Sequence, residues 1–588
     1  MPGASTSSTV ITRTALNPRL EGPRRLRPPP RPKTLSVPSP SAQPNPKALA
    51  AVQQAVGLWR ELAADTQTSY DTDLASSLSH LGRCLSEMGW REKALAAEQE
   101  AVKIWRRLSA GDRTANKFGL ASSLNNLGVH LSEAGQPEEA LSVAQEAVEI
   151  RRQQAEDSPG TYKPDLATSL TALGNLLLTA GRLEEALTIG QEAVELWRQL
   201  AAVNPAAYGR DLAMSLCYLG GFLWELGRRE KALAAEQEAL RIRRQLAAGK
   251  PASYEPDLAT SLNNLGLHLW EAGQPEEALT ATQEAVGVYL QLTADNPAAY
   301  GSGLAAALHN LGRHLSEAGR LEEAVTATQE AVRIRRQLTA SDPTTNEPDL
   351  AKSLHDLGNR LAVVGRLREA VTATQEAVRI RRQLTADDPA TYKPDFAGSL
   401  HNLGVYLSDA GLQKAALAAT QEALRVYLQL AADDPITYES NLAISLHSLG
   451  DRLRTAGRPE EALTATQEAV RIRRQLTASD PTAHRPDLAA SLNMLGLYLS
   501  YAERHQEAMT AIQEAVDIRR QLAASDPATY EHGLAPSLTG WSSVMYQAQQ
   551  DPCGALEATE EAVEIYRRLT ATAPARFLES LHTVLRLQ

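Results

Sequence analysis

The sequence predicts an all-α solenoid built from antiparallel helix pairs. The first observation is a unit of 46 residues that recurs eleven times without a shift in register, from about residue 73 to 572. The second is that each unit holds two apolar patterns at helical spacing, separated by a turn such as Gly319-Arg320. A repeat period of this size is typical of solenoids, in which each unit buries its apolar face against its neighbours.

Composition narrows the class of protein further. Of 588 residues, 43% are hydrophobic and 22% are charged, which is ordinary for a globular chain. We expect neither a transmembrane helix nor a signal peptide, because the apolar runs are short and the N-terminus has no apolar core region. The three cysteines, Cys84, Cys217 and Cys553, lie in distant repeats. They indicate no disulfide framework and fit a reducing cytoplasm.

The net charge of −11 divides unevenly along the chain. Residues 1–46 carry seven Lys or Arg against Glu21 alone, so they contribute +6 and the rest of the chain −17. The acidic body argues against a nucleic-acid groove, which requires a basic stripe. Residues 1–46 are rich in Pro, Arg and Ser and are predicted to be a disordered tail. This basic tail is either a solvated leader or an arm that contacts anions.

The predicted solenoid covers residues 47–588. It opens with an unpaired second helix (helix B) at 47–64 and closes with an unpaired first helix (helix A), a capping helix, at about 577–588. Eleven A–B pairs lie between them, which gives 24 helices and no strand. The last repeat is degenerate, with Trp541-Ser542 in place of Leu-Gly.

Three local signals set the expected helix ends. Helix A usually follows an aspartate such as Asp165 or Asp211, which we take as its N-cap. Helix B usually begins with glutamate and often ends in Arg-Arg, a charge order that favours the helix dipole. An Asp-Pro loop then closes the unit, because proline cannot continue a helix.

The repeats can be compared with one another by numbering helix A so that Leu78 is position 4. Position 1 is Ala and position 4 is Leu in all eleven copies, whereas positions 7 and 11 are Leu and position 8 is Gly in ten. Positions 4, 7, 8 and 11 share one face of a helix. Gly and Ala on that face allow close helix approach.

This pattern resembles the tetratricopeptide repeat, whose signature has Leu-Gly at positions 7–8 and Ala at 20 and 27. Repeat six carries the signature residues Leu308, Leu311, Gly312, Leu315, Ala324 and Ala331. The unit departs from the 34-residue form through a longer helix B and loop, closer to the kinesin-light-chain type, and Thr328 stands where an aromatic residue is expected. The resemblance implies a right-handed superhelix in which helix A lines the concave side.

The candidate site is the polar and variable face of helix A opposite the core, at positions 2, 6, 9 and 13, with positions 5 and 12 at its edges. In tetratricopeptide proteins these positions bind extended peptides, and Asn holds the ligand backbone because an amide both donates and accepts. The alternative is that these residues are merely solvated. The candidate groove residues are Asn125, Asn126, Asn263, Asn264, His309, Asn310, Arg313, His355, Asn359, His401, Asn402, His447, Trp224 and Trp270.

Four histidines, His309, His355, His401 and His447, occupy position 5 in consecutive repeats. Neighbouring helices lie about 8–10 Å apart, whereas a metal needs ligands at about 2 Å, so we predict no metal site. Two interpretations remain: a pH-sensitive stripe, open to water, for an acidic peptide, or copies of one ancestral histidine. Duplication is favoured, because the sequence ATQEAVRIRRQLTA is identical at 327–340, 373–386 and 465–478.

Trp224 and Trp270 occupy position 12 of consecutive repeats and fit either a binding hot spot or packing between repeats. No nucleotide-binding, serine-hydrolase or metalloprotease motif is present in the sequence. We therefore expect no enzyme, no cofactor and no catalytic residue.

The sequence thus predicts a cytoplasmic scaffold that holds a protein or peptide in a concave groove. The alternative is a ligand-sensing or regulatory module that works with a separate nucleotide-switch ATPase or caspase-like protease. Abundant Ala and Arg with little Lys, Phe and Met indicate a GC-rich bacterial genome.

Overall fold

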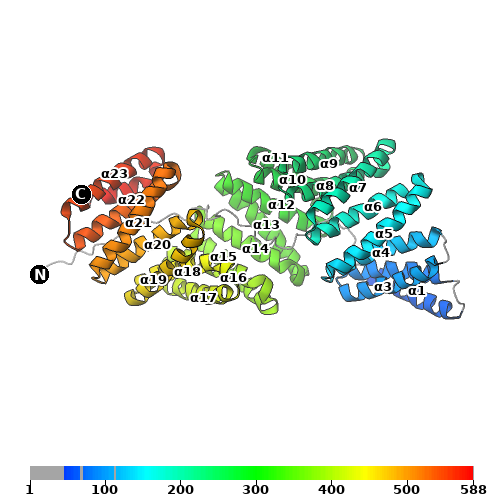
Figure 1. Ribbon diagram of the computed structural model, residues 1–588, viewed down its shortest axis with the longest axis horizontal. Helices are drawn as coiled ribbons and strands as arrows, with labels where there is room; N and C mark the ends of the chain where they lie inside the picture. The colour runs from blue at the N-terminus through cyan, green and yellow to red at the C-terminus, as the bar shows by residue number, and fades with distance from the viewer. Residues whose placement is uncertain (1–45, 66–69, 111–113, 587–588) are drawn as a thin grey trace. The chain divides into compact units, whose positions relative to one another are not determined.

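The computed structural model describes residues 46–65, 70–110 and 114–586, and within these ranges all 24 regular elements are α-helices (Figure 1). This confirms the predicted order of one unpaired helix B, eleven A–B pairs and one unpaired helix A. Even-numbered helices are helices A and odd-numbered ones are helices B. The predicted basic tail lies outside the described residues, apart from Pro46.

The helices form two compact units that divide at residues 343 and 344. The N-terminal unit contains α1 Pro46–Asp65, α2 Asp71–Glu87, α3 Arg91–Ser109, α4 Thr114–Glu133, α5 Pro137–Asp157, α6 Pro159–Thr179, α7 Leu183–Val203, α8 Pro205–Glu225, α9 Arg229–Gly249, α10 Pro251–Glu271, α11 Pro275–Asp295, α12 Pro297–Glu317 and α13 Leu321–Ser341. The C-terminal unit contains α14 Pro343–Val363, α15 Leu367–Asp387, α16 Pro389–Asp409, α17 Gln413–Asp433, α18 Pro435–Thr455, α19 Pro459–Ser479, α20 Pro481–Tyr501, α21 His505–Ser525, α22 Pro527–Gln547, α23 Pro552–Thr572 and α24 Pro574–Leu585.

The period of 46 residues follows from the helix lengths. In a typical repeat helix A (α6) and helix B (α7) each have 21 residues, three residues join A to B, and Asn204 alone joins B to the next helix A. The extra length over the 34-residue form was predicted to lie in helix B and a loop. The loop part of that prediction is wrong, because the supposed loop residues form the first turns of the next helix A.

The predicted start of helix A after an aspartate is also wrong. Asp211 lies inside α8, which begins at Pro205. Proline suits the first helical position because its fixed φ is helical and its missing N–H would have no partner there. The preceding residue is the cap: the Asn204 side chain accepts a hydrogen bond from Ala207 N at 3.2 Å, and Asp388 does the same for Thr391 N.

The turn from helix A to helix B depends on a left-handed residue. In the α6–α7 turn Gly181 has φ +76° and its N–H donates to the Leu178 carbonyl, while the Arg182 N–H donates to the Leu177 carbonyl. Glycine adopts this conformation without the steric penalty that a Cβ brings.

Successive repeats pack through one buried position near the middle of helix B. In several repeats it is an arginine, and the guanidinium groups of Arg243 and Arg381 donate to the carbonyls of Asp257 (3.0 Å) and Asp395 (2.9 Å) in the next helix A. In other repeats the residue at this position of helix B is aromatic, and the residue that it contacts in the next helix A is then often small. Tyr289, for example, packs against Gly303, where an added Cβ would lie 2.5 Å from the tyrosine ring. The same position between repeats is thus filled either by a hydrogen-bonded arginine or by an aromatic ring.

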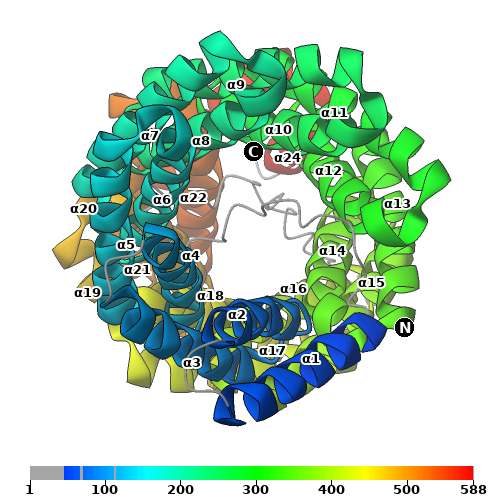
Figure 2. The same cartoon turned by 90° about the vertical axis from the view of Figure 1, so that its right-hand side faces the viewer.

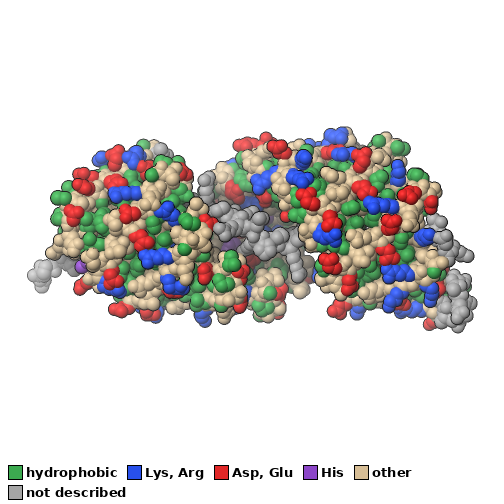
Figure 3. Space-filling view, in the orientation of Figure 1, with side chains coloured by type: hydrophobic (Ala, Val, Ile, Leu, Met, Phe, Trp, Pro, Cys, Tyr) green, Lys and Arg blue, Asp and Glu red, His purple; other side chains and the backbone are tan. Residues whose placement is uncertain are grey.

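The second arginine of the Arg-Arg pair lies on the outer surface, where it binds the helix B of the next repeat. In α3 both arginines, Arg106 and Arg107, lie in the last turn, as the predicted dipole role requires. In the helices B from α5 to α23 the last turn has no basic residue, as in α13, so the prediction is wrong for them. The outer ion pairs have N–O distances of 2.5–2.8 Å and mix both charge signs over the surface (Figure 3). They are Arg60–Glu100, Arg106–Glu146, Arg152–Glu192, Arg198–Glu238 and Arg244–Glu284 in the N-terminal unit, and Arg382–Glu422, Arg474–Glu514 and Arg520–Glu561 in the C-terminal unit.

No helix among the described residues is both long and apolar enough to span a bilayer.

The fold predicts a sharp contrast between two side chains of α14. Leu354 is fully buried, whereas Val363 is 55% exposed. Leu354→Ala should lower the free energy of unfolding by about 2–5 kcal/mol, because it leaves a cavity. Val363→Ala should change it by less than about 0.5 kcal/mol. Denaturant unfolding of both variants measures the difference, and comparable losses would contradict the assignment of the buried face.

Candidate functional site

Helices A form the inner side of each unit. In the N-terminal unit the even-numbered helices lie inside the odd-numbered ones, and the chain turns clockwise as it recedes from the viewer, which makes this unit right-handed (Figure 2). Successive helices A also contact one another, as α2 does with α4, α10 with α12 and α20 with α22. The helices that carry the candidate residues therefore lie on the concave side of their own unit.

Position 5, however, faces the interface between repeats. The Asn125 amide donates to Ser169 Oγ of the next helix A at 2.7 Å. His355 Nδ1 lies 3.0 Å from Ser399 Oγ, and His447 Nδ1 lies 3.2 Å from Ser491 Oγ. These side chains join consecutive repeats, a role that the sequence analysis missed although the partner serine recurs at position 3 of most repeats.

The four histidines are less open to water than expected, because His355, His401 and His447 are half-buried and His309 is buried. Burial, aided by Arg381, lowers the pKa of His355 to about 4, and burial with Arg452 does the same for the pKa of His401. Burial, aided by Arg473 and Arg452, lowers the pKa of His447 to about 3. These three imidazoles are therefore neutral at both pH 5.5 and pH 7.5, and the interpretation as a pH-sensitive stripe loses its basis.

Position 6 of one helix A places an amide against position 5 or position 9 of the preceding helix A. In the N-terminal unit the Asn310 amide donates to Asn263 Oδ1 at 3.0 Å. In the C-terminal unit the Asn402 amide donates to Asn359 Oδ1 at 3.0 Å. Among the described residues, no side-chain hydrogen bond engages the carbonyl oxygens of Asn310 and Asn402 or the amide nitrogens of their partners. Each pair thus retains a donor and an acceptor for a ligand.

The other candidate residues differ in exposure. Asn126 is exposed, whereas Asn264 and Arg313 are half-buried. Two guanidinium nitrogens of Arg313 are buried and have no hydrogen-bond partner among the described residues. The two tryptophans are packing residues of the N-terminal unit. Trp224 stacks on His268 with ring centroids 4.2 Å apart, and Trp270 stacks on His314 at 4.6 Å.

A second matched contact between repeats was not predicted. One partner is the helix B residue that touches the position-8 glycine of its own repeat, and the other is the residue at position 10 of the next helix A. Glu236 meets His268 at 2.6 Å, and Thr282 meets His314 at 3.3 Å. Burial opposes protonation of His268, but Glu236 outweighs it and raises the pKa of that imidazole. The two residues at this contact are also matched in size: in an earlier repeat the large Phe222 at position 10 lies against Gly190.

Sequence patterns of one family cover most of the repeats. A tetratricopeptide repeat pattern matches residues 73–153, 120–199, 211–291 and 257–337. A second tetratricopeptide repeat pattern matches residues 350–390, 396–435, 442–480 and 488–527. Together they match more than half of the chain. No curated protein sequence matches it.

Three solved structures are similar to this chain. BtubC (BKLC) from P. vanneervenii is 23% identical over 42% of this chain and 92% of its own, with a TM-score of 0.37. The apo form of RapI is 14% identical over 69% of this chain and 99% of its own, with a TM-score of 0.46. A Signal Transduction ATPase with Numerous Domains protein with a tetratricopeptide repeat sensor, from Pyrococcus horikoshii, is 12% identical over 67% of this chain and 55% of its own, with a TM-score of 0.42.

The matched contacts predict coupling between Gly190 and Phe222. A Cβ at residue 190 would lie 2.8 Å from the Phe222 ring. Gly190→Ala should cost about 1–3 kcal/mol through overpacking, offset by up to about 1 kcal/mol of helix propensity. Phe222→Leu alone should leave a cavity. The double variant recreates the Ala144 and Leu176 combination of the preceding interface, so it should lose less than the sum by about 0.5–3 kcal/mol. Additive losses in a double-mutant unfolding cycle would refute the coupling.

The lowered pKa values of His355, His401 and His447 predict a loss of stability in acid. In the unfolded chain each histidine titrates near pH 6.5, but three of them titrate at about 4, 4 and 3 in the fold. Between these values the unfolded chain binds more protons, so the free energy of unfolding falls as the pH falls from about 6.5 to about 4. The triple variant His355→Asn/His401→Asn/His447→Asn should show a shallower decline, because Asn does not titrate. Denaturant midpoints at several pH values test this, and parallel curves would contradict it.

Proposed function

We propose a function for this chain, which belongs to the tetratricopeptide repeat family. It is a non-enzymatic scaffold that binds an extended protein or peptide segment along the inner face of its helices A. The ligand backbone hydrogen-bonds to the amide pairs, and the variable side chains around them select its sequence. Each unit presents one such pair, Asn263–Asn310 and Asn359–Asn402.

The observation that carries this proposal is the free hydrogen-bonding capacity of the paired amides. A peptide bond offers one donor and one acceptor, and each Asn pair keeps one of each. The pairing also holds both side chains in place, which reduces the entropy lost when a ligand binds.

The alternative, a regulatory module that works with a separate ATPase or protease, stays a prediction. It would use the same inner face, and no contact described above favours it over a free-standing scaffold.

Selection of ligands from a phage-displayed library of random peptides tests the proposal. Enriched peptides should bind the wild-type chain and should bind Asn310→Ala or Asn402→Ala about three- to tenfold more weakly, the equivalent of one hydrogen bond. The control is Arg198→Gln, which removes an outer ion pair (Arg198–Glu238) and should leave affinity unchanged. Thermal unfolding shows whether each variant folds.

The contrary result is equally clear. Peptides that bind both Asn variants as tightly as wild type, or that lose affinity in Arg198→Gln, would place the ligand elsewhere than on the inner face.

A further inference from the structure

Helix α17, the helix B of repeat eight, lacks charged residues that its counterparts carry at two places on their outer surface. In α15, α19 and α21 an arginine before the helix binds a glutamate in its first turn: Arg366–Glu369, Arg458–Glu461 and Arg504–Glu507, at 2.6–2.7 Å. The corresponding residues of α17 are Leu412, which is 53% exposed, and Ala415. Its first turn has no acidic residue.

The series of outer ion pairs between successive helices B is interrupted on the same helix. Leu428 stands where Arg382 and Arg474 stand in the neighbouring repeats, and it is 50% exposed. Glu468, which an arginine at residue 428 would bind, instead binds Arg471 of its own helix at 2.6 Å. The outer surface of α17 thus has exposed leucines at two positions where the equivalent helices have arginines, and Lys414 is the charged residue of its first turn.

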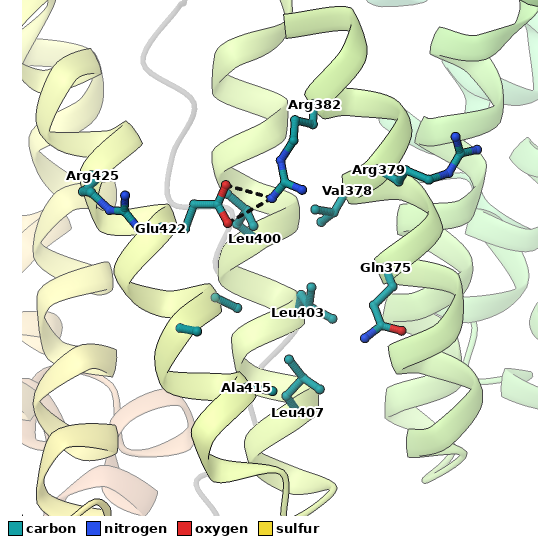
Figure 4. A pocket seen from close by; sticks show the side chains of 12 residues that line it. Gln375, Val378, Arg379, Arg382, Leu400, Leu403, Leu407, Ala415, Glu422 and Arg425 are labelled. Atoms are coloured by element: carbon teal, nitrogen blue, oxygen red, sulfur yellow. Dashed lines mark hydrogen bonds and ion pairs between the residues drawn. The ribbon is translucent and has the colours of Figure 1, made fainter. Parts of the chain in front are cut away.

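A cavity of about 380 Å³ lies on the α15 side of α17, between α15 and α17 and above α16 (Figure 4). The side chains of Leu400, Leu403 and Leu407 from α16 form its floor. Ala415 and Ala418 form the α17 wall, where α19 has the larger Glu461 and Thr464. The cavity therefore exists because small residues replace larger ones at these two positions.

The rim of the cavity is basic on a chain whose body is acidic. Three arginines line it, Arg379, Arg382 and Arg425, against Glu422 as its carboxylate. Arg382 and Glu422 neutralise each other across one end at 2.8 Å (Figure 4). Arg379 and Arg425 are exposed and make no ion pair among the described residues. Two exposed guanidinium groups are therefore available to a carboxylate that approaches the cavity.

We propose that the cleft between α15 and α17 docks an acidic segment of a partner protein, with one or two aliphatic side chains inserted into the cavity and carboxylates bound to Arg379 and Arg425. The cavity volume falls within the range of about 300–1,000 Å³ that is typical of ligand sites. The exposed Leu412 adds apolar contact at the start of α17, and the basic rim selects carboxylates over other flanking groups. This surface is on the outer side of the C-terminal unit, so it is separate from the inner face of the helices A.

The probe for this site is a fluorescein-labelled helical peptide made of Leu, Ala and Glu, compared with a copy in which Lys replaces every Glu. Fluorescence anisotropy on the full chain should show the acidic peptide binding at least about tenfold more tightly than the Lys copy. Equal affinity of the two peptides, or no binding of the acidic one, would overturn the proposal.

Two variants identify the site. Ala415→Glu/Ala418→Thr copies the residues of α19, so it should fold normally while it fills the cavity and adds a repelling carboxylate; binding should fall at least about tenfold. Arg425→Gln should weaken binding less. Its matched control is Arg471→Gln, at the same register of α19, which should have no effect. Undiminished binding by the double variant, in a protein that melts like wild type, would overturn the proposal, as would equal losses in the two Arg variants.

Discussion

The close contact between the position-8 glycine of helix A and the helix B behind it sets the geometry of the repeats. At Gly312 a Cβ would overlap Thr328 Oγ1 and lie 3.2 Å from the Ala324 carbonyl oxygen. No larger residue fits, so the two helix backbones stay at a short distance that the buried leucines and alanines on either side can fill. A fixed distance within each pair lets the next pair stack in the same way, and the short connections preserve that register.

A regular backbone does not make the repeats interchangeable. Each interface has its own matched side chains: a buried arginine with a backbone carbonyl, an aromatic ring with glycine, Glu236 with His268, Gly190 with Phe222. Moving one repeat elsewhere would leave a buried charge unpaired or an aromatic ring without space, each costing about 1–3 kcal/mol. The order of the repeats is therefore specified by side chains within the interfaces.

The two surfaces of each unit differ for a physical reason. On the inner side the helices A of successive repeats touch, so short polar side chains such as Asn359 and Asn402 can bond directly from repeat to repeat. On the outer side the connections are made by long arginine and glutamate side chains, which reach between neighbouring helices B. Where an arginine of that series of ion pairs is replaced, at Leu290 and Leu428, both leucines are about half exposed, and the outer face gains apolar area.

The sequence by itself determined the fold class, the number and order of the helices and the buried positions, because all of these follow from a periodic pattern that eleven copies repeat. It failed at the helix ends, where Asp211 was taken for a cap although Pro205 begins the helix, since a proline that starts a helix and one that ends it look alike in sequence. It also could not show which side of position 5 is buried. His355 and His447 lie on the shoulder of the helix, and only the stacking of the next repeat covers them and brings Ser399 and Ser491 within reach. Contacts between residues 44 positions apart leave no periodic signal along one helix, so the tertiary structure alone decided them.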